Sequence, residues 1–276
     1  MFSRATYLAF SMLFLAGCVA DQAVELESRP IALDQNAEPA GPQSAASVAN
    51  LLPGTGPTYV TLTIAEHESG ITAASSGRNA STPITSGSGF VVSGDGYVIT
   101  AAHVGVAKGN EVSARAANGR IYSGTVVGLL PENDMALIKL RSFSGRAVAP
   151  ASPGCVANGD LLYTLGKPHG GGDTARIGTL QTKHFGRPVS YGKFGYPDAL
   201  VLHMGTQRGE SGGPVYNSKG QLVGMVVSTL SDSTGQSINL AHAIPANTIG
   251  KFYCSQSSCG PQWSGLAALP VDSCGS

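Results

Sequence analysis

The chain has 276 residues, of which 42% are hydrophobic and 12% are charged, and it contains 37 glycines. Its 17 Lys and Arg residues balance 17 Asp and Glu residues, and this zero net charge argues against a binding surface for nucleic acid or for anionic lipid. The length accommodates one substantial domain or two small domains that share an interface, and the glycine content favours short strands joined by turns over a helical bundle.

The first residues have the pattern of an export signal. A short basic start ends at Arg4, and the apolar run over 5–15 is too short to span a bilayer. Residues 15–18 (LAGC) resemble a bacterial lipobox. This resemblance predicts a lipoprotein signal peptide over 1–18 and a membrane anchor through lipidation of Cys18, and the several acyl chains of such an anchor would hold the chain firmly.

Two further features bear on where the exported chain would reside. Val19, in place of Asp, after the lipidated cysteine favours an outer-membrane or periplasm-facing lipoprotein in the cell envelope. The alternative is ordinary cleavage after Ala20, which would leave a soluble periplasmic or secreted protein. Residues 19–56 are rich in Ala, Pro, Glu and Gln without a sustained period, so we expect a flexible tether there.

A first set of strands follows the tether. Alternation of polar and apolar residues and two turn signals, 93–96 (SGDG) and 118–119 (NG), predict strands and hairpins up to residue 141. The segment 66–85 is expected to be a polar loop. The expected strands are 59–65, 89–92, 97–101, 111–116, 120–127 and 135–140.

A second set begins after a connecting segment over 141–154. Its expected strands are 160–165, 174–183, 199–203, 214–216, 221–229 and 237–244. A short helix over 246–253 and a cysteine-containing tail over 254–276 complete the chain. Regularly spaced strands with turns between them predict an all-β fold with two antiparallel barrels, over 57–141 and 155–245.

Four cysteines remain after the predicted signal peptide. An even number in an exported chain suggests two disulfides, for which the sequence permits three pairings. We favour Cys254–Cys259 as a short local loop and Cys155–Cys274 as a link between the tail and the second barrel. The alternative is free, buried thiols. The CxxC spacing of zinc sites does not occur, so no metal site is predicted.

Three short motifs carry the chemistry. They are 100–104 (TAAHV), 134–140 (DMALIKL) and 209–214 (GESGGP). Serine becomes a nucleophile only when a base removes its proton, and histidine suits that task because its pKa is near neutrality. A carboxylate on the other ring nitrogen would fix the tautomer, and glycines would let backbone N–H groups turn towards an oxyanion. The motifs therefore predict His103, Asp134 and Ser211 as a catalytic triad.

These motifs, in this order, resemble those of trypsin-like serine peptidases of the chymotrypsin fold. Residues 86–92 (SGSGFVV) and 95–100 (DGYVIT) resemble the HtrA/Deg branch, as do 158–160 (NGD), 166–170 (GKPHG) and 243–247 (AIPAN). The resemblance spans about residues 57–253 and implies a peptidase domain of two Greek-key barrels without a cofactor. It also implies that the N–H groups of Gly209 and Ser211 form the oxyanion hole. No PDZ-like segment is expected after residue 253, and the resemblance carries no oligomeric state to this chain.

Glu210 departs from the family pattern, and we expect it to face solvent or to pair with a cation such as Arg208. The resemblance also places a substrate pocket over 205–209, 226–229 and 239–242. Near its floor stands Gly205, without a carboxylate for a basic substrate residue, and Val227 and Leu240 favour small aliphatic side chains. His242 either faces the pocket, where it could pair with an acidic substrate residue, or lies in the barrel core.

The sequence therefore predicts a serine endopeptidase that cleaves polypeptides of the cell envelope through an acyl-enzyme. One alternative is a catalytically inactive lipoprotein that uses the peptidase scaffold for binding or assembly. Another is esterase or acyl-transfer activity by the same triad. Residues 209–213 formally match the GxSxG elbow of α/β-hydrolases, but those enzymes run Ser, Asp, His along the chain, and this chain runs His, Asp, Ser.

Overall fold

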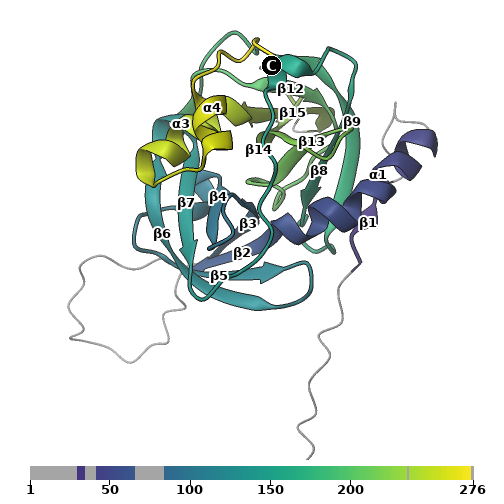
Figure 1. Cartoon of the computed structure of the whole chain (residues 1–276). Helices are drawn as coiled ribbons and strands as arrows, with labels where there is room; N and C mark the ends of the chain where they lie inside the picture. Colours follow the sequence, from purple (N-terminus) through teal and green to yellow (C-terminus); the bar gives the residue numbers. More distant parts are fainter. Residues whose placement is uncertain (1–29, 35–41, 66–83, 235, 275–276) are drawn as a thin grey trace, which may run out of the picture.

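The computed structural model describes residues 30–34, 42–65, 84–234 and 236–274. The predicted signal peptide with Cys18, and most of the predicted loop over 66–85, lie outside the described residues. Two β-barrels dominate the structure, with short helices packed around them (Figure 1).

Barrel one is a closed antiparallel barrel of six strands. Its strands neighbour one another in the order β2-β3-β4-β7-β6-β5, and β2 closes the ring by pairing with both β3 and β5. Alternating side chains from these strands fill the interior, as the sequence pattern predicts. The strands are β2 (Tyr59–Ala65), β3 (Ile84–Val91), β4 (Tyr97–Thr100), β5 (Glu111–Ala116), β6 (Ile121–Leu130) and β7 (Met135–Leu140).

Barrel two has the same number of strands. Its order is β9-β12-β15-β14-β13-β8, and pairing of β8 with β9 closes the ring. The prediction of two antiparallel barrels is therefore confirmed. The strands are β8 (Leu161–Gly166), β9 (Thr174–Thr182), β12 (Leu200–His203), β13 (Pro214–Asn217), β14 (Leu222–Ser231) and β15 (Ser237–Pro245).

A small hairpin between β9 and β12 was not expected from the sequence. Strands β10 (Val189–Tyr191) and β11 (Phe194–Tyr196) pair with each other, and in the part of the chain that the structure describes they pair with no strand of either barrel. The hairpin reaches from barrel two to the 3-10 turn η2 (Pro131–Asn133) of barrel one. It thus brings aromatic side chains of one barrel to the catalytic-motif region of the other.

The prediction of a tether over 19–56 is wrong for the described part of that segment. Strand β1 (Ala32–Leu33) adds to barrel two in parallel with β9, and helix α1 (Pro42–Thr55) leads through η1 (Gly56–Thr58) into β2. Val48 of this stretch is completely buried in the core, and Ile31, Leu33, Leu51 and Leu52 pack against the core partly buried. The Thr58 hydroxyl also hydrogen-bonds that of Tyr216, at 2.7 Å. These tertiary contacts order a segment whose composition alone suggested a loose chain.

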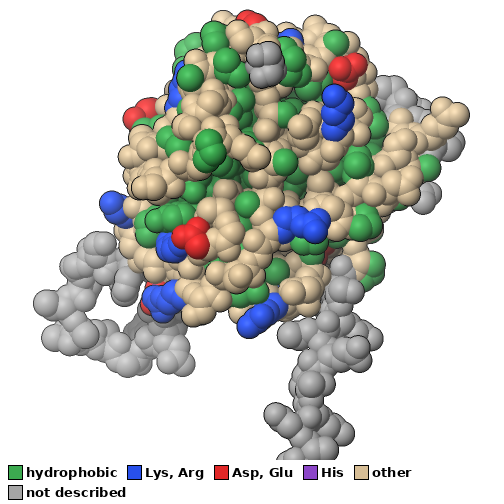
Figure 2. All heavy atoms as spheres, viewed as in Figure 1, with side chains coloured by type: hydrophobic (Ala, Val, Ile, Leu, Met, Phe, Trp, Pro, Cys, Tyr) green, Lys and Arg blue, Asp and Glu red, His purple; other side chains and the backbone are tan. Residues whose placement is uncertain are grey.

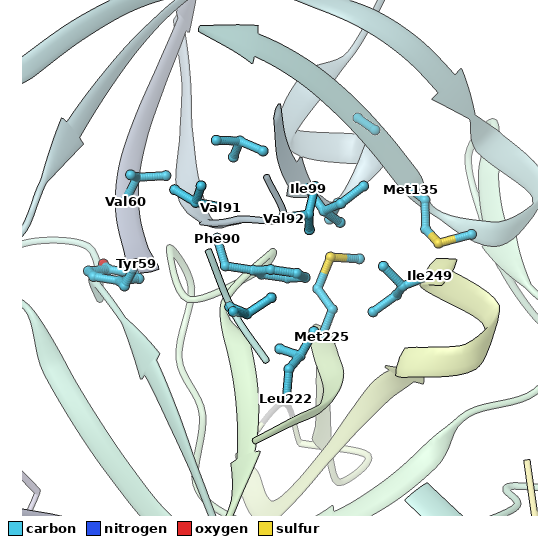
Figure 3. Packing of buried hydrophobic residues seen from close by; sticks show 14 of the residues in the cluster. Tyr59, Val60, Phe90, Val91, Val92, Ile99, Met135, Leu222, Met225 and Ile249 are labelled. Atoms are coloured by element: carbon cyan, nitrogen blue, oxygen red, sulfur yellow. The ribbon is translucent and has the colours of Figure 1, made fainter. Parts of the chain in front are cut away.

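One hydrophobic cluster joins the two barrels. Figure 3 shows Phe90 and Ile99 of barrel one facing Leu222 and Met225 of barrel two, with Ile249 of the C-terminal helix beside them. A second cluster fills the interior of barrel two. The first cluster contains residues of both barrels, so each barrel covers apolar surface of the other. The two barrels are therefore parts of a single folding unit.

Two helices follow the last strand and cover barrel one beside β6 and β7 (Figure 1). Helix α3 (Ala246–Gln256) extends the predicted helix, and α4 (Pro261–Ala267) lies within the predicted tail. Trp263 is buried there and donates its indole N–H to the carbonyl of Val92, at 3.1 Å. The structure contains both favoured disulfides, Cys254–Cys259 and Cys155–Cys274.

The surface matches the balanced composition. On the face drawn in Figure 2, charged side chains of both signs are spread among polar and apolar ones, and no large patch of one sign forms. Among the described residues, no helix has the length and hydrophobicity needed to cross a bilayer.

Candidate active site

A cleft of about 930 Å³ lies between the barrels and contains the histidine and serine motifs. His103 and Val104 line it from barrel one, and Gly209 and Ser211 line it from barrel two. The hairpin contributes Tyr191. The rest of the lining is mostly polar: Ile84, Thr85, Ser86, His169, Thr206, Gln207, Arg208, Ser228, Thr229, Ser231 and Ser237.

The fold brings His103 and Asp134 into direct contact. His103 lies on the single helical turn α2 (Ala102–Gly105) after β4, and Asp134 precedes β7 in a left-handed conformation with φ 48°. His103 Nδ1 is 2.8 Å from one carboxylate oxygen of Asp134, and the backbone N–H of His103 donates to the other at 3.0 Å. Since a carboxylate only accepts, Nδ1 carries the hydrogen and leaves Nε2 as the basic nitrogen.

Asp134 is completely buried, so its charge depends on donors for stabilisation. The hairpin supplies one of them, because the Tyr191 hydroxyl donates to Asp134 Oδ2. Burial, and secondarily the Asp134 charge, raise the pKa of Tyr191, which keeps this hydroxyl protonated. Tyr191 and Phe194 also present their rings to the imidazole, with centroids 5.8 Å and 6.3 Å away.

Sequence reasoning missed Tyr191 and Phe194. The signal available was a glycine-containing stretch, 191–196 (YGKFGY), with three aromatic residues around Gly192-Lys193. Such a pattern indicates a hairpin but not its destination in the other barrel.

The loop around Ser211 is held by hydrogen bonds to its carbonyl groups. The Gly209 carbonyl accepts from Ser88 Oγ at 2.9 Å, and the Arg208 carbonyl accepts from the His169 N–H at 2.8 Å. The Ser211 carbonyl accepts from the Ser88 N–H at 2.9 Å. Within the described part of the chain, the N–H groups of Gly209 and Ser211 donate to no protein acceptor.

Glycine is required at two positions of this loop. Gly209 has φ 95°, and a Cβ there would lie 2.4 Å from the Lys167 carbonyl oxygen. Gly212 has φ 84°, and a Cβ there would lie 2.1 Å from the Ser88 carbonyl oxygen. The loop therefore approaches neighbouring backbone more closely than any other residue would permit.

Glu210 pairs with a cation, which is one of the two alternatives that the sequence left open, but the cation is Arg176 and not Arg208. The side chain is completely buried, so it does not face solvent. Arg176 Nε lies 2.6 Å and 2.8 Å from the two carboxylate oxygens. Burial raises the pKa of Glu210, while the Arg176 charge acts in the opposite direction.

The four predicted pocket residues do not line the cleft that the described residues form. Val227 is buried, Gly205 and Leu240 are half-buried, and their neighbours Thr206, Ser228 and Thr229 line the cleft instead. The lining of the cleft near Ser211 is consequently more polar than that of the apolar pocket that the sequence predicts.

His242 of β15 is completely buried and packs against the rings of Phe185 and Tyr196. Its neighbours Ala241 and Ala243 belong to the interior cluster of barrel two, so His242 faces the other side of the strand. Its Nδ1 and the Tyr196 hydroxyl are 2.8 Å apart, and the same hydroxyl is 2.8 Å from Ser228 Oγ. Burial lowers the pKa of His242, so its ring is neutral near pH 7. Its Nε2 has no hydrogen-bond partner among the described residues. Those residues also contain no group of three or more His, Cys, Asp or Glu side chains placed to hold a metal ion.

Comparisons with known proteins agree with this geometry. Residues 87–225 match the trypsin-like peptidase domain. The chain is 30% identical over 194 residues to a protein of Brucella suis named a probable periplasmic serine endoprotease DegP-like, and 33% identical over 168 residues to one of the same name in Rhizobium meliloti. These matches cover 68% and 60% of this chain but only 37% and 32% of the relatives, so the chain matches about a third of their length.

Solved structures show the same fold. An HtrA-type protease, AlgWS227A with tripeptide, superposes with a TM-score of 0.62 at 24% identity, over 75% of this chain and 62% of that one. The same protease type with a decapeptide, AlgW, gives a TM-score of 0.60 over 75% and 66%. The match over 87–225 includes His103, Asp134 and Ser211. The chain therefore belongs to the trypsin-like peptidase family, with DegP-like and HtrA-type proteases among its relatives.

Proposed function

We propose that the chain is a serine endopeptidase. The observation that carries this proposal is a buried Asp134 hydrogen-bonded to His103 in the cleft that also contains Ser211 and two N–H groups without protein acceptors. A polarised imidazole, a hydroxyl and free amide donors are the parts that acyl transfer requires. No observation favours the inactive scaffold, since each of these parts is present.

In the first step, His103 Nε2 takes the proton of Ser211 Oγ while that oxygen attacks the carbonyl carbon of the scissile peptide. Asp134 stabilises the resulting imidazolium through Nδ1–H. The C–N bond then breaks, and His103 gives the proton to the leaving amine. A water molecule, deprotonated by the same nitrogen, attacks the ester and releases the carboxylic acid with regeneration of Ser211. The reaction balances without a cofactor.

The oxyanion formed in each step would accept hydrogen bonds from the N–H groups of Gly209 and Ser211. Their availability follows from the carbonyl contacts of the loop: with the Arg208 carbonyl held by His169, the Gly209 N–H on the same peptide unit points the other way. Loss of one such donor typically costs a factor of about 100 to 1,000 in kcat.

The substrate residue that precedes the scissile bond is proposed to be small and uncharged. Thr206, Ser228 and Thr229 line this part of the cleft, and no carboxylate is among its lining residues. A buried, neutral His242 offers no cation for an acidic side chain. Gly205, Val227 and Leu240 would then shape the pocket from behind its lining, and a peptide library should show Gly, Ala, Val, Ser or Thr at the cleaved position and should exclude Glu, Lys and Arg.

The cell envelope is the proposed location, because relatives of this chain are named periplasmic. A lipid on Cys18 of the leader 1–18 would anchor the enzyme there, with the peptidase domain spanning about 57–253 and polypeptides of the envelope as substrates. Metabolic labelling with a fatty-acid probe, compared between the wild type and Cys18→Ser, tests the anchor independently of catalysis.

The activity itself is tested with a fluorophosphonate, which labels a serine only when a base activates it. We expect labelling of the full chain, loss of labelling in Ser211→Ala and in His103→Ala, and cleavage of a casein-type substrate by the wild type alone. A folded wild-type chain that is neither labelled nor active would overturn the proposed function.

A further inference from the structure

The side chain of Glu210, the residue before Ser211, points into the protein. Glu210 is fully buried, and besides Arg176 its carboxylate accepts a hydrogen bond from the Gln207 N–H at 2.6 Å. The carboxylate thus fixes the shape of the loop 207–211 from its buried side, because it binds the N–H of the first residue of the loop and belongs to the residue that precedes Ser211. Gly166 makes room for it: a Cβ at Gly166 would lie 2.8 Å from Glu210 Cβ and Cγ.

A buried carboxylate needs a cation, and the chain provides it from another strand. Arg176 of β9 is 8% exposed and presents Nε to Glu210. A buried charge without its partner is strongly unfavourable, so Glu210 adopts this inward position only while Arg176 is in place. The guanidinium geometry matters, because its planar fork of donors is fixed in the geometry that carboxylates accept, whereas an ammonium group is a compact, strongly hydrated point charge.

The second carboxylate comes from the N-terminal strand. Asp34 accepts a hydrogen bond from Arg176 Nη1. Parallel pairing fixes its place: β1 aligns Leu33 with Ala175, and the Asp34 N–H donates to the Ala175 carbonyl at 2.9 Å. Asp34 therefore stands beside Arg176 because of backbone hydrogen bonds, independently of its charge.

We propose that Arg176 and Asp34 are positioning residues for the oxyanion-binding loop, so that docking of the strand β1 completes the part of the active site that barrel two contributes. The chain Asp34–Arg176–Glu210 runs from the N-terminal strand to the residue next to Ser211. Release of β1 frees one end of the guanidinium, lets Glu210 leave its buried position and shifts the N–H groups of Gly209 and Ser211. The proposal rests on the proposed peptidase function.

The test uses the full chain and separates transition-state stabilisation from folding. The readouts are kcat and KM on a fluorogenic peptide, inhibition by a peptide boronic acid, and the melting temperature. A boronic acid forms a tetrahedral adduct with the serine and places an oxygen in the oxyanion site. Arg176→Lys should lower kcat about 100-fold with KM changed less than about threefold, the size expected for a lost oxyanion donor. Asp34→Asn should lower kcat about tenfold, and the boronic acid should bind more weakly in parallel.

Arg115→Lys is the matched control. Arg115 forms a comparable ion pair with buried Asp173, at 3.0 Å, but it has no contact with Glu210. We expect its kcat and inhibition to equal those of the wild type. If Arg176→Lys does not fold, Arg176→Met/Glu210→Leu removes both charges together and should fold with a similarly low kcat.

Each outcome bears on the proposal. Asp34→Asn and Arg176→Lys with kcat and boronic-acid affinity equal to those of the Arg115→Lys control would overturn the positioning role while the proposed function stands. A wild-type chain that fluorophosphonate does not label would overturn the proposed function and the positioning role together.

Discussion

The Tyr191 hydroxyl donates a hydrogen bond to Asp134, although the two residues belong to different barrels. Asp134 orients His103, so a hairpin of barrel two takes part in fixing the tautomer and position of the proposed base in barrel one. A neutral donor on the carboxylate also spreads its negative charge away from the imidazole.

Tyr191→Phe removes this donor and leaves the ring contacts in place. We expect kcat/KM to fall about tenfold, as for loss of one hydrogen bond to a charged group. Steady-state rates on a fluorogenic peptide measure this loss. Tyr122→Phe, at a tyrosine packed on Phe143 away from the cleft, is the control, and a kcat/KM of Tyr191→Phe equal to that of the control would contradict the assignment.

Gly209→Ala tests the close approach of the loop to residues 167–169. A Cβ would meet the Lys167 carbonyl and His169 Cδ2 at 2.4 Å and 2.6 Å, so the peptide must tilt and the Gly209 N–H must move. We expect kcat to fall by a factor of about 100 or more. Gly159→Ala provides a control for backbone strain alone, because Gly159 has φ 88° but open space around it. Its melting temperature should fall while its kcat stays that of the wild type; equal kcat in both variants would rule out the close-approach argument.

The two disulfides should differ in their effect on stability. Cys155 and Cys274 are separated by 119 positions, and Cys254 and Cys259 by 5. On the loop-entropy model, the longer loop stabilises the fold by about 3 kcal/mol more than the shorter one. Denaturant unfolding of the Cys155→Ser/Cys274→Ser and Cys254→Ser/Cys259→Ser chains, under oxidising conditions, measures the difference. Equal losses would show that chain entropy is not what these disulfides contribute.

His184 makes stability depend on pH. Hydrogen bonds that its ring donates to the carboxylates of Asp198 first and Asp272 second raise its pKa above the ordinary value of about 6.5. The folded chain therefore favours the imidazolium, and this stabilisation is complete below about pH 6.5 and is lost as the pH rises through the raised pKa. The melting temperature of His184→Gln should fall below that of the wild type at about pH 5.5 and approach it at about pH 8.5. A difference that grows at alkaline pH would have the wrong sign.

Much of the fold was predictable because its signals are local. Alternating residues and turns such as 118–119 mark the strands of both barrels, and the spacing of three motifs indicates His103, Asp134 and Ser211. Helix α1 was missed because its composition is that of a loose segment, and only contacts with the barrels order it.

The predicted pocket segments 205–209 and 226–229 contain residues that line the cleft, among them Thr206 and Ser228. The residues that the sequence singled out in these segments, Gly205 and Val227, do not line it. Neighbouring residues of a strand face opposite sides, so a shift of one residue exchanges pocket and core. The pairing of β14 with β15 changes register between Val226 and Ser228, an irregularity that strict alternation does not predict.

The partner of Glu210 was also beyond local reasoning. Arg208 is nearby in sequence, but Arg176 lies across the barrel on β9, and only the closed ring of strands brings it to the carboxylate. The same holds for Tyr191, whose target is set by how two barrels meet.

Ser88 links the two barrels at the loop that contains Ser211. From barrel one, its hydroxyl and its N–H hold the carbonyl groups of Gly209 and Ser211, which belong to barrel two. Small displacements at this contact between the barrels would abolish hydrolysis under conditions in which both barrels remain folded. A reagent, a mild denaturant or an applied force that slightly separates the two barrels should therefore abolish the activity reversibly, while the secondary structure stays intact.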